Sequence, residues 1–207
     1  MTSESKPFRP LVSVLMAAYN HEKYVEDSVR SIFAQTYPNL ELIVIDDGSR
    51  DRTPDILRRL AAESPIPMRL EVQSNVGTTR TMNRAFSLAN GEIIAFSASD
   101  DRLLPHHVET LVNAYLAAPP ETGLVFGDMY VIDEAGNRTE RIFRTATPRD
   151  GWVYEDFLLR RCMVPGLAAI VPAKVFREVG GYNEGSQIDD IEFLTRIARH
   201  HPFLFVN

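Results

Sequence analysis

Residues 93–101 read Ile93-Ile94-Ala95-Phe96-Ser97-Ala98-Ser99-Asp100-Asp101, a short apolar run that ends in two adjacent carboxylates. Such a run predicts a buried β-strand, and the Pro105 that follows is typical of the first turn of a helix. Two carboxylates where a strand leaves the core lose solvation unless a cation meets them, and carboxylate oxygens suit Mg²⁺ or Mn²⁺. Asp before a Pro-led helix is also an ordinary helix cap. The stretch therefore predicts a strand that ends in a metal site or a cap.

Strands and helices alternate on both sides of this stretch. Apolar patterns predict strands at residues 11–16, 40–45, 68–72 and 92–96, and helices at residues 22–35, 54–63, 78–89 and 105–117. This alternation is typical of an α/β fold with a mostly parallel sheet and helices on both faces. Ligands of such sheets bind where the strands end at their carboxyl side. We therefore expect one rim to gather Tyr19-Asn20, Asp46-Asp47, residues 75–80 and Asp100-Asp101.

The second half of the chain has shorter and less regular segments. We expect strands at residues 124–127, 167–171 and 203–206, a strand running into a hairpin turn over residues 131–137, an irregular loop at 137–151, and helices at 154–160, 173–179 and 188–199. Repeats and linker-like segments are absent from the sequence. This pattern predicts a polar N-terminal tail, residues 1–10, and a single domain, residues 11–207. Because the last residues form an apolar strand pattern, we expect the natural chain to continue.

Composition narrows the class of protein. The 207 residues carry a formal net charge of −6, which argues against a general nucleic-acid-binding protein. The single Cys162 excludes an internal disulfide and fits a reducing compartment. Neither an apolar stretch of the roughly 20 residues that span a bilayer nor a secretory signal is found. We expect a cytoplasmic protein, with peripheral contact at the inner face of the membrane left open.

The loops after the strands do not match the common phosphate-binding motifs. The sequence lacks G-x-x-x-x-G-K-[ST], and the first strand is not followed by G-x-G-x-x-G. Tyr19 at the exit of the first strand could stack on a flat ring or pack in the core. Asp47 could accept a hydrogen bond from a base or a ribose, or form the turn that Asp-Asp-Gly-Ser favours. These residues leave both interpretations open.

Five segments, in this order and spacing, resemble the family 2 glycosyltransferases, which have the GT-A fold. They span most of the chain from residue 11 to residue 200, and they comprise residues 12–20, 35–49, 75–85, 99–105 and 180–190. The resemblance implies an enzyme that moves a sugar from a nucleotide-sugar donor, expected to be UDP-linked, to an acceptor hydroxyl. It further implies a nucleotide-binding half, residues 11–104, and an acceptor-binding half, residues 105–207.

The resemblance also assigns the donor site residue by residue. It implies that the nucleotide contacts Ala17, Tyr19, Asp47, Asn75, Gly77, Arg80 and Ser99. A divalent cation, Mn²⁺ or Mg²⁺, would be bound by Asp100, with Asp101 beside it. The D-x-D motif of the family aligns with Ala98-Ser99-Asp100, so this chain has alanine at the first acidic position. For Arg84, on the predicted helix, we expect a surface ion pair rather than a role in binding.

On the acceptor side, the resemblance implies that Asp190 is the general base of an inverting, in-line displacement. Its neighbour Asp189 belongs to the same acidic pair, but the helix dipole also stabilises a carboxylate in the first turn of a helix, so a capping role for Asp189 stays open. Trp152 could stack on an acceptor sugar, and Gly166 lies in a segment expected near the acceptor. His106 and His107, in the first turn of a predicted helix, are expected to face solvent.

Two other functions remain open at this stage. A nucleotidyltransferase could use the same architecture, although the first strand lacks the glycine- and arginine-rich loop that such enzymes carry. A non-catalytic nucleotide-binding domain of a larger transferase would explain Ala98. The acceptor, whether a glycan, a lipid-linked molecule or a small molecule, is not encoded in a motif. The resemblance suggests synthesis of bacterial cell-surface or secreted glycans, and the oligomeric state, including a homodimer, is left open.

Overall fold

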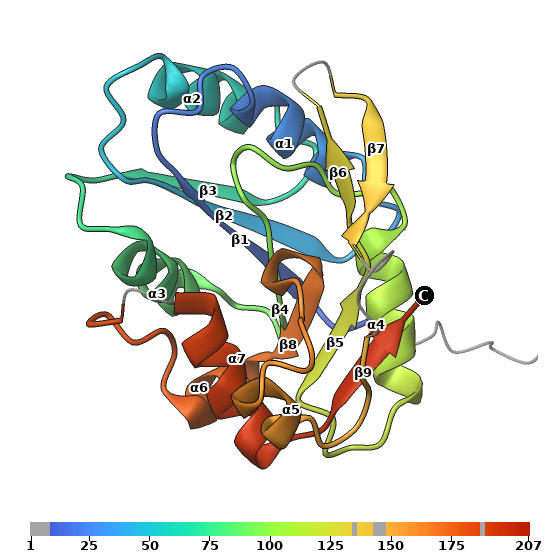
Figure 1. Cartoon of the computed structure of the whole chain (residues 1–207). Helices are drawn as coiled ribbons and strands as arrows, with labels where there is room; N and C mark the ends of the chain where they lie inside the picture. The colour runs from blue at the N-terminus through green and yellow to red at the C-terminus, as the bar shows by residue number, and fades with distance from the viewer. Residues whose placement is uncertain (1–8, 134–135, 143–147, 187–188) are drawn as a thin grey trace, which may run out of the picture.

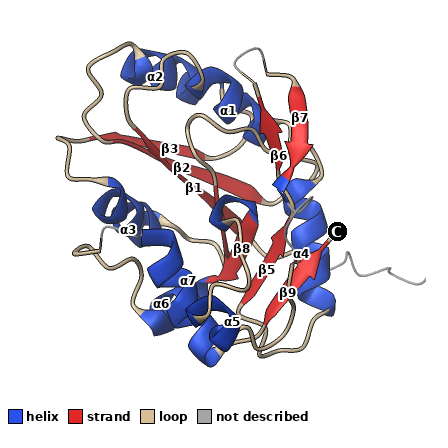
Figure 2. Ribbon diagram, viewed as in Figure 1, coloured by secondary structure: helices blue, strands red, loops and turns tan. Residues whose placement is uncertain are grey.

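A computed structural model describes residues 9–133, 136–142, 148–186 and 189–207. Its centre is a seven-stranded sheet with the strand order β3-β2-β1-β4-β8-β5-β9 (Figures 1 and 2). The strands are β1 (Val12–Ala18), β2 (Leu40–Asp46), β3 (Met68–Val72), β4 (Ile93–Phe96), β5 (Leu124–Gly127), β8 (Ala169–Pro172) and β9 (Phe203–Val206). β8 runs antiparallel to both of its neighbours, β4 and β5, and the other pairings are parallel. The predicted mostly parallel α/β sheet is confirmed.

Helices cover both faces of the sheet, as the apolar strands predicted. They are α1 (Val25–Phe33), α2 (Thr53–Glu63), α3 (Thr78–Leu88), α4 (His107–Ala117), α5 (Tyr154–Leu158), α6 (Ala173–Val179) and α7 (Asp189–His200). Alternate residues of β1 face opposite ways: Val14 packs in the cluster with α1, α2 and α4, whereas Leu15 packs with α3, α6 and α7. In Figure 1, α1 and α2 lie above the sheet and α3, α6 and α7 below it. Burial on both faces explains why these strands read as continuous apolar runs.

The two halves of the chain meet inside this one sheet. β4 from the first half pairs with β8 from the second, with Ile94 opposite Val171. A hairpin of β6 (Tyr130–Ile132) and β7 (Arg138–Arg141) forms a separate two-stranded sheet beside the main one (Figure 1). A shared sheet explains why the sequence shows no linker between the halves.

Several predicted boundaries were wrong. The helix expected from residue 22 begins at Val25, and the one expected from residue 105 begins at His107. The irregular loop expected at 137–151 contains β7, whose four residues are all exposed, so it carries no apolar pattern. The strand expected from residue 167 begins at Ala169, after a single 3₁₀ turn at Gly166–Ala168. The calls on residues 1–8 and 187–188 lie outside the described residues.

A buried carboxylate joins three strands near the amino end of the sheet. Glu41 is 8% exposed, and its Oε1 accepts hydrogen bonds from the Ser13 hydroxyl at 2.5 Å and the Asn90 N–H at 2.7 Å. The Asn90 side chain donates to Oε2, and the Gly91 N–H donates to the Ser13 hydroxyl. These contacts fix the strand ends opposite the polar rim. Within the described part of the chain, none of the helices is long and apolar enough to cross a membrane.

Candidate active site

A pocket of about 220 Å³ lies at the carboxyl ends of β1, β2 and β4, and we call it the rim pocket. It is lined by Ala17, Ala18, Tyr19, His21, Asp47, Thr78, Ala98, Ser99 and Asp100. The structure thus brings together four of the predicted nucleotide-binding residues, Ala17, Tyr19, Asp47 and Ser99, and places Asp100 beside them. Tyr19 is 43% exposed, so its ring is available to a ligand rather than buried in the core. Asn75, Gly77 and Arg80 are not among the lining residues.

Asp47 holds the wall of the rim pocket. Its Oδ1 accepts hydrogen bonds from the Val76 N–H at 2.9 Å and the Gln73 amide at 2.8 Å, and its Oδ2 accepts one from the Gly77 N–H at 2.9 Å. Burial raises the pKa of this carboxyl, but the hydrogen bonds outweigh burial, and the net pKa is below the ordinary value. A carboxylate has about four acceptor positions, and the hydrogen bonds from Gln73, Val76 and Gly77 occupy most of them. Asp47 therefore fixes the loop that contains Asn75 and Gly77.

The turn after β2 explains why the sequence has Asp-Asp-Gly-Ser there. The Asp46 carboxylate accepts hydrogen bonds from the N–H and the hydroxyl of Ser49. Gly48 has a φ of +79°, and a Cβ placed on it would lie 2.7 Å from the Asn75 backbone nitrogen. Glycine is required because the turn and the loop from β3 approach each other so closely. The turn contacts expected of Asp47 are made by the Asp46 side chain, while the Asp47 side chain accepts hydrogen bonds from the loop at residues 73–77.

The Ser99-Asp100-Asp101 segment contacts a residue that the sequence analysis did not single out. His21 Nδ1 lies 2.8 Å from the Ser99 hydroxyl and 3.8 Å from Asp100 Oδ1. The chain reaches this position through Asn20, which has a left-handed φ of 53°. Asn tolerates a left-handed φ better than most residues. The Tyr-Asn-His order after a strand could therefore have indicated that the chain turns at Asn20 and brings His21 to this segment. Ala98 supplies no carboxylate here, and His21, in the loop between β1 and α1, contacts this segment.

Asp100 and Asp101 are the carboxylates of this segment that could contribute oxygen ligands to a cation. The Asp100 side chain is 48% exposed, and burial raises the pKa of Asp101, with a further rise from Asp100 and an opposing effect of His21. Among the described residues, no three His, Cys, Asp or Glu side chains gather to hold a metal. Mg²⁺ and Mn²⁺ are commonly bound by one or two carboxylates together with substrate phosphates. The residues present therefore fit a cation that arrives with a diphosphate.

Asp190 lies in the first turn of α7, beside Gly166. It is exposed, and a Cβ placed on Gly166 would lie 3.2 Å from Asp190 Oδ2. Gly166 therefore leaves room for the Asp190 carboxylate. The prediction for the Asp189 side chain falls outside what the structure describes.

Trp152 does not join the other candidate residues. It follows Gly151, which bridges to Phe203 at the start of β9, and it is 66% exposed. β9 is parallel to β5, and β5 and β4 are both antiparallel to β8, so the start of β9 lies at the amino ends of the central strands. Trp152 thus lies at the edge opposite the rim pocket, and we assign it no role in the site.

Helix α3 connects the rim pocket to the turn that precedes α7. Arg80, expected near the diphosphate, pairs instead with Glu184 at 3.2 Å. Asn83 donates a hydrogen bond to the Tyr182 carbonyl and accepts one from the Tyr182 N–H. From the other side, Arg196 on α7 donates to the carbonyls of Val179 and Gly181. The surface ion pair predicted for Arg84 is confirmed, since it binds Glu71 at 2.6 Å.

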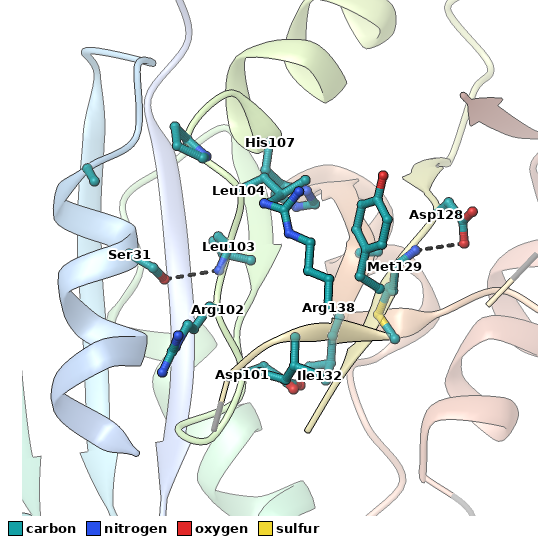
Figure 3. A pocket seen from close by; sticks show the side chains of 16 residues that line it. Ser31, Asp101, Arg102, Leu103, Leu104, His107, Asp128, Met129, Ile132 and Arg138 are labelled. Atoms are coloured by element: carbon teal, nitrogen blue, oxygen red, sulfur yellow. Dashed lines mark hydrogen bonds between the residues drawn. The ribbon is translucent and has the colours of Figure 1, made fainter. Parts of the chain in front are cut away.

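A second pocket, of about 400 Å³, lies on the other side of the segment that contains Asp101, and we call it the hairpin pocket (Figure 3). It is lined by Ser31, Ala34, residues 101–105, His107, Asp128, Met129, Tyr130, Ile132, Gly136, Arg138, Leu167 and Ala168. The expectation that His107 faces solvent was wrong: its Nε2 atom is buried without a hydrogen-bond partner in the described structure. Burial lowers the pKa of His107 to about 4, so the ring is neutral at pH 7.

The mostly parallel α/β sheet, with helices on both faces and a polar pocket at its carboxyl edge, has the GT-A class of fold, which it shares with the solved structures described below. Residues 13–170 match the model of glycosyl transferase family 2, and the chain belongs to that family. Among curated relatives, an uncharacterized glycosyltransferase of Rickettsia conorii is 29% identical over 99% of this chain and 34% of its own length. The putative teichuronic acid biosynthesis glycosyltransferase TuaG of Bacillus subtilis is 39% identical over 46% of this chain and 38% of its own length.

Solved structures show the same fold. The mannosyltransferase PcManGT from Pyrobaculum calidifontis, in complex with GDP-Man and Mn²⁺, has a TM-score of 0.72 at 24% identity and covers 97% of this chain and 55% of its own. TarS 1–349 of S. aureus, in complex with UDP, has a TM-score of 0.71 at 17% identity and covers 95% of this chain and 61% of its own. The chain spans about a third of the length of the first curated relatives.

Proposed function

We propose that this chain transfers a sugar from a nucleotide-sugar donor, UDP-linked, to an acceptor hydroxyl with inversion at the anomeric carbon. One observation carries the proposal: the rim pocket, which ends at Asp100, lies at the edge of the sheet where α/β folds bind nucleotides. The relatives support the donor class, because the solved structures similar to this chain include complexes with UDP, UDP-GlcNAc and GDP-Man. We further propose a role in the synthesis of bacterial cell-surface glycans on the cytoplasmic side. The relative named for teichuronic acid biosynthesis supports a role in glycan synthesis.

Each group in the site has a role suited to its position. Tyr19, exposed at the pocket, would stack on the base, and Asp47 would keep the wall of the pocket in place. Asp100 and Asp101 would hold Mn²⁺ or Mg²⁺, which when bound supplies positive charge to the departing nucleoside diphosphate. Asp190 would take the proton of the acceptor hydroxyl as its oxygen attacks. A carboxylate of ordinary basicity is sufficient for this step when it is well placed.

The test separates binding from turnover. Titration calorimetry with UDP, with and without Mn²⁺, measures donor-site binding, and a donor-hydrolysis assay over several UDP- and GDP-sugars measures turnover. We expect UDP to bind more tightly with Mn²⁺, and one donor to be consumed. Asp190→Asn should keep UDP binding and lose turnover, because an amide cannot accept the proton. Binding without turnover for any donor would instead favour a non-catalytic nucleotide-binding domain, and absence of nucleotide binding would refute the proposal.

A further inference from the structure

The hairpin pocket adjoins both reacting sides of the proposed enzyme. A small intermediate pocket contains both Asp100, which it shares with the rim pocket, and Asp101, which it shares with the hairpin pocket. The hairpin pocket is also lined by Leu167, the residue after Gly166, and Gly166 lies against Asp190. A molecule in the hairpin pocket would therefore lie near the proposed cation site and near the proposed base.

The lining of the hairpin pocket is suited to a sugar. Its volume of about 400 Å³ lies within the range of roughly 300–1,000 Å³ for small-molecule sites. Leu103, Leu104, Met129 and Ile132 provide apolar surface, and Tyr130 adds an aromatic ring that can pack on the C–H face of a pyranose. His107 also lines the pocket, and its Nε2 atom is buried without a hydrogen-bond partner in the described structure.

The charged side chains of the hairpin pocket favour an acceptor that carries a negative charge. Arg102 pairs with Asp27, and Asp128 pairs with Arg141. Asp101 adjoins Asp100, where the cation is proposed. For Arg138, the described residues provide no carboxylate partner, and its guanidinium lies 4.9 Å from the centre of the Tyr130 ring. In Figure 3 the Arg138 side chain extends across the pocket toward His107 and Leu104. A guanidinium in this position is matched by a carboxylate or a phosphate.

We propose that the hairpin pocket binds the acceptor, and that the acceptor is a sugar bearing an anionic group that pairs with Arg138 while its ring packs on Tyr130. This inference rests on the proposed function and names the acceptor class for the same site. The anionic group is a carboxylate, as in a uronic acid, or a phosphate ester. Both groups carry negatively charged oxygens that accept hydrogen bonds from the Arg138 guanidinium.

The test uses the full chain saturated with UDP and Mn²⁺. Binding of methyl β-glucuronide, glucose 6-phosphate and the neutral methyl β-glucoside is measured by ligand-observed NMR titration. We expect at least one anionic sugar to bind roughly tenfold more tightly than the glucoside, since a charge-assisted hydrogen bond is lost in the neutral sugar. The anionic sugar that binds identifies the source of the charge. Arg138→Gln should abolish the preference for the anionic sugar, and Tyr130→Ala should weaken the binding of all three sugars. Arg58→Gln on α2 is the control and should change neither the preference nor the affinities.

Three results would overturn the inference: equal binding of charged and neutral sugars, an anionic preference that persists in Arg138→Gln, or no binding of any of the three sugars. The proposed function is tested separately in the same samples. If UDP binds and a donor is consumed while these sugars fail, the acceptor class is wrong and the transferase proposal stands. If UDP itself does not bind, the proposed function fails.

Discussion

Asn83 on α3 and Tyr182 in the turn before α7 are joined by two hydrogen bonds between one side chain and the backbone N–H and C=O of one residue. The Asn83 amide nitrogen lies 2.9 Å from the Tyr182 carbonyl oxygen, and the Tyr182 nitrogen lies 2.8 Å from Asn83 Oδ1. α3 itself begins beside Gly77, whose N–H is bound by Asp47 in the rim pocket. One rigid helix thus links the proposed donor site to the turn that leads into Asp190. We infer that Asn83 is a positioning residue.

Replacing Asn83 should affect turnover more than donor binding. In Asn83→Ala the turn at Tyr182 loses both hydrogen bonds, and a small displacement of a catalytic group is costly in rate. We expect kcat for donor consumption to fall roughly tenfold or more, while the Kd for UDP stays within about twofold. Arg84→Ala is the matched control, because Arg84 lies on the same helix but pairs with Glu71. An equal loss of kcat in the control, or a loss of UDP binding in Asn83→Ala, would contradict the positioning role.

Gly166→Ala should reduce activity without unfolding the protein. The added methyl group would lie 3.2 Å from Asp190 Oδ2, closer than ordinary van der Waals contact, so the carboxylate has to move. If Asp190 is the base, we expect kcat to fall by roughly ten- to a hundredfold, with UDP affinity unchanged. Circular dichroism and thermal melting report whether the fold is retained. Full activity in a folded Gly166→Ala variant would mean that the position of Asp190 is not critical, which is incompatible with its role as base.

Acid should destabilise the protein through Glu41 and Asp47. Burial raises the pKa of each carboxyl, but in each case hydrogen bonds outweigh it and the net pKa is lowered, from ordinary values of 4.5 and 3.8. A carboxyl with a lowered native pKa binds fewer protons folded than unfolded, so its contribution is complete above the unfolded pKa and is lost as the pH falls through the native pKa. We expect the free energy of unfolding from urea titrations to decline below about pH 4.5.

Glu41→Gln isolates one part of that decline. Glutamine cannot accept all the hydrogen bonds that Ser13 and Asn90 donate, so we expect a loss of roughly 1–3 kcal/mol at pH 7 and a shallower decline in acid. Glu155→Gln, at an exposed position on α5, is the control and should leave both quantities nearly unchanged. An acid slope in Glu41→Gln as steep as in the wild type would show that Glu41 does not contribute to it.

The parts of the fold that could be predicted are those where local pattern and tertiary burial agree. Strands such as β2 and β4 are buried on both faces, so their apolar runs and the rim at their ends were readable from the sequence. β7 was missed because all four of its residues are exposed. The same limit applied to the site. Asp47 was identified, but its engagement with Val76 and Gly77 depends on β3 lying beside β2, and the partners of Asn83 and His21 are 99 and 78 residues away.

His21 is a residue that the structure adds to the proposed donor site. Its role can be tested by comparing UDP binding with and without a metal ion. Position 98 is alanine, and the segment that carries Asp100 is contacted by His21 from the loop after β1. The His21 Nδ1 lies 2.8 Å from the Ser99 hydroxyl and 3.8 Å from Asp100 Oδ1. If His21 orients Asp100 toward a cation, His21→Ala should weaken UDP binding several-fold in Mn²⁺, since oriented ligands bind metals better.

Removing the metal distinguishes this role from direct contact with the nucleotide. After treatment with EDTA, the wild type and His21→Ala should bind UDP with equal affinity, because the effect of His21 acts through Asp100. His106→Ala is the matched control, since His106 is exposed and its ring contacts Thr36, away from the rim pocket. It should behave as the wild type under both conditions. If His21→Ala weakens UDP binding equally with Mn²⁺ and with EDTA, His21 contacts the nucleotide itself, and the orientation of Asp100 must come from another residue.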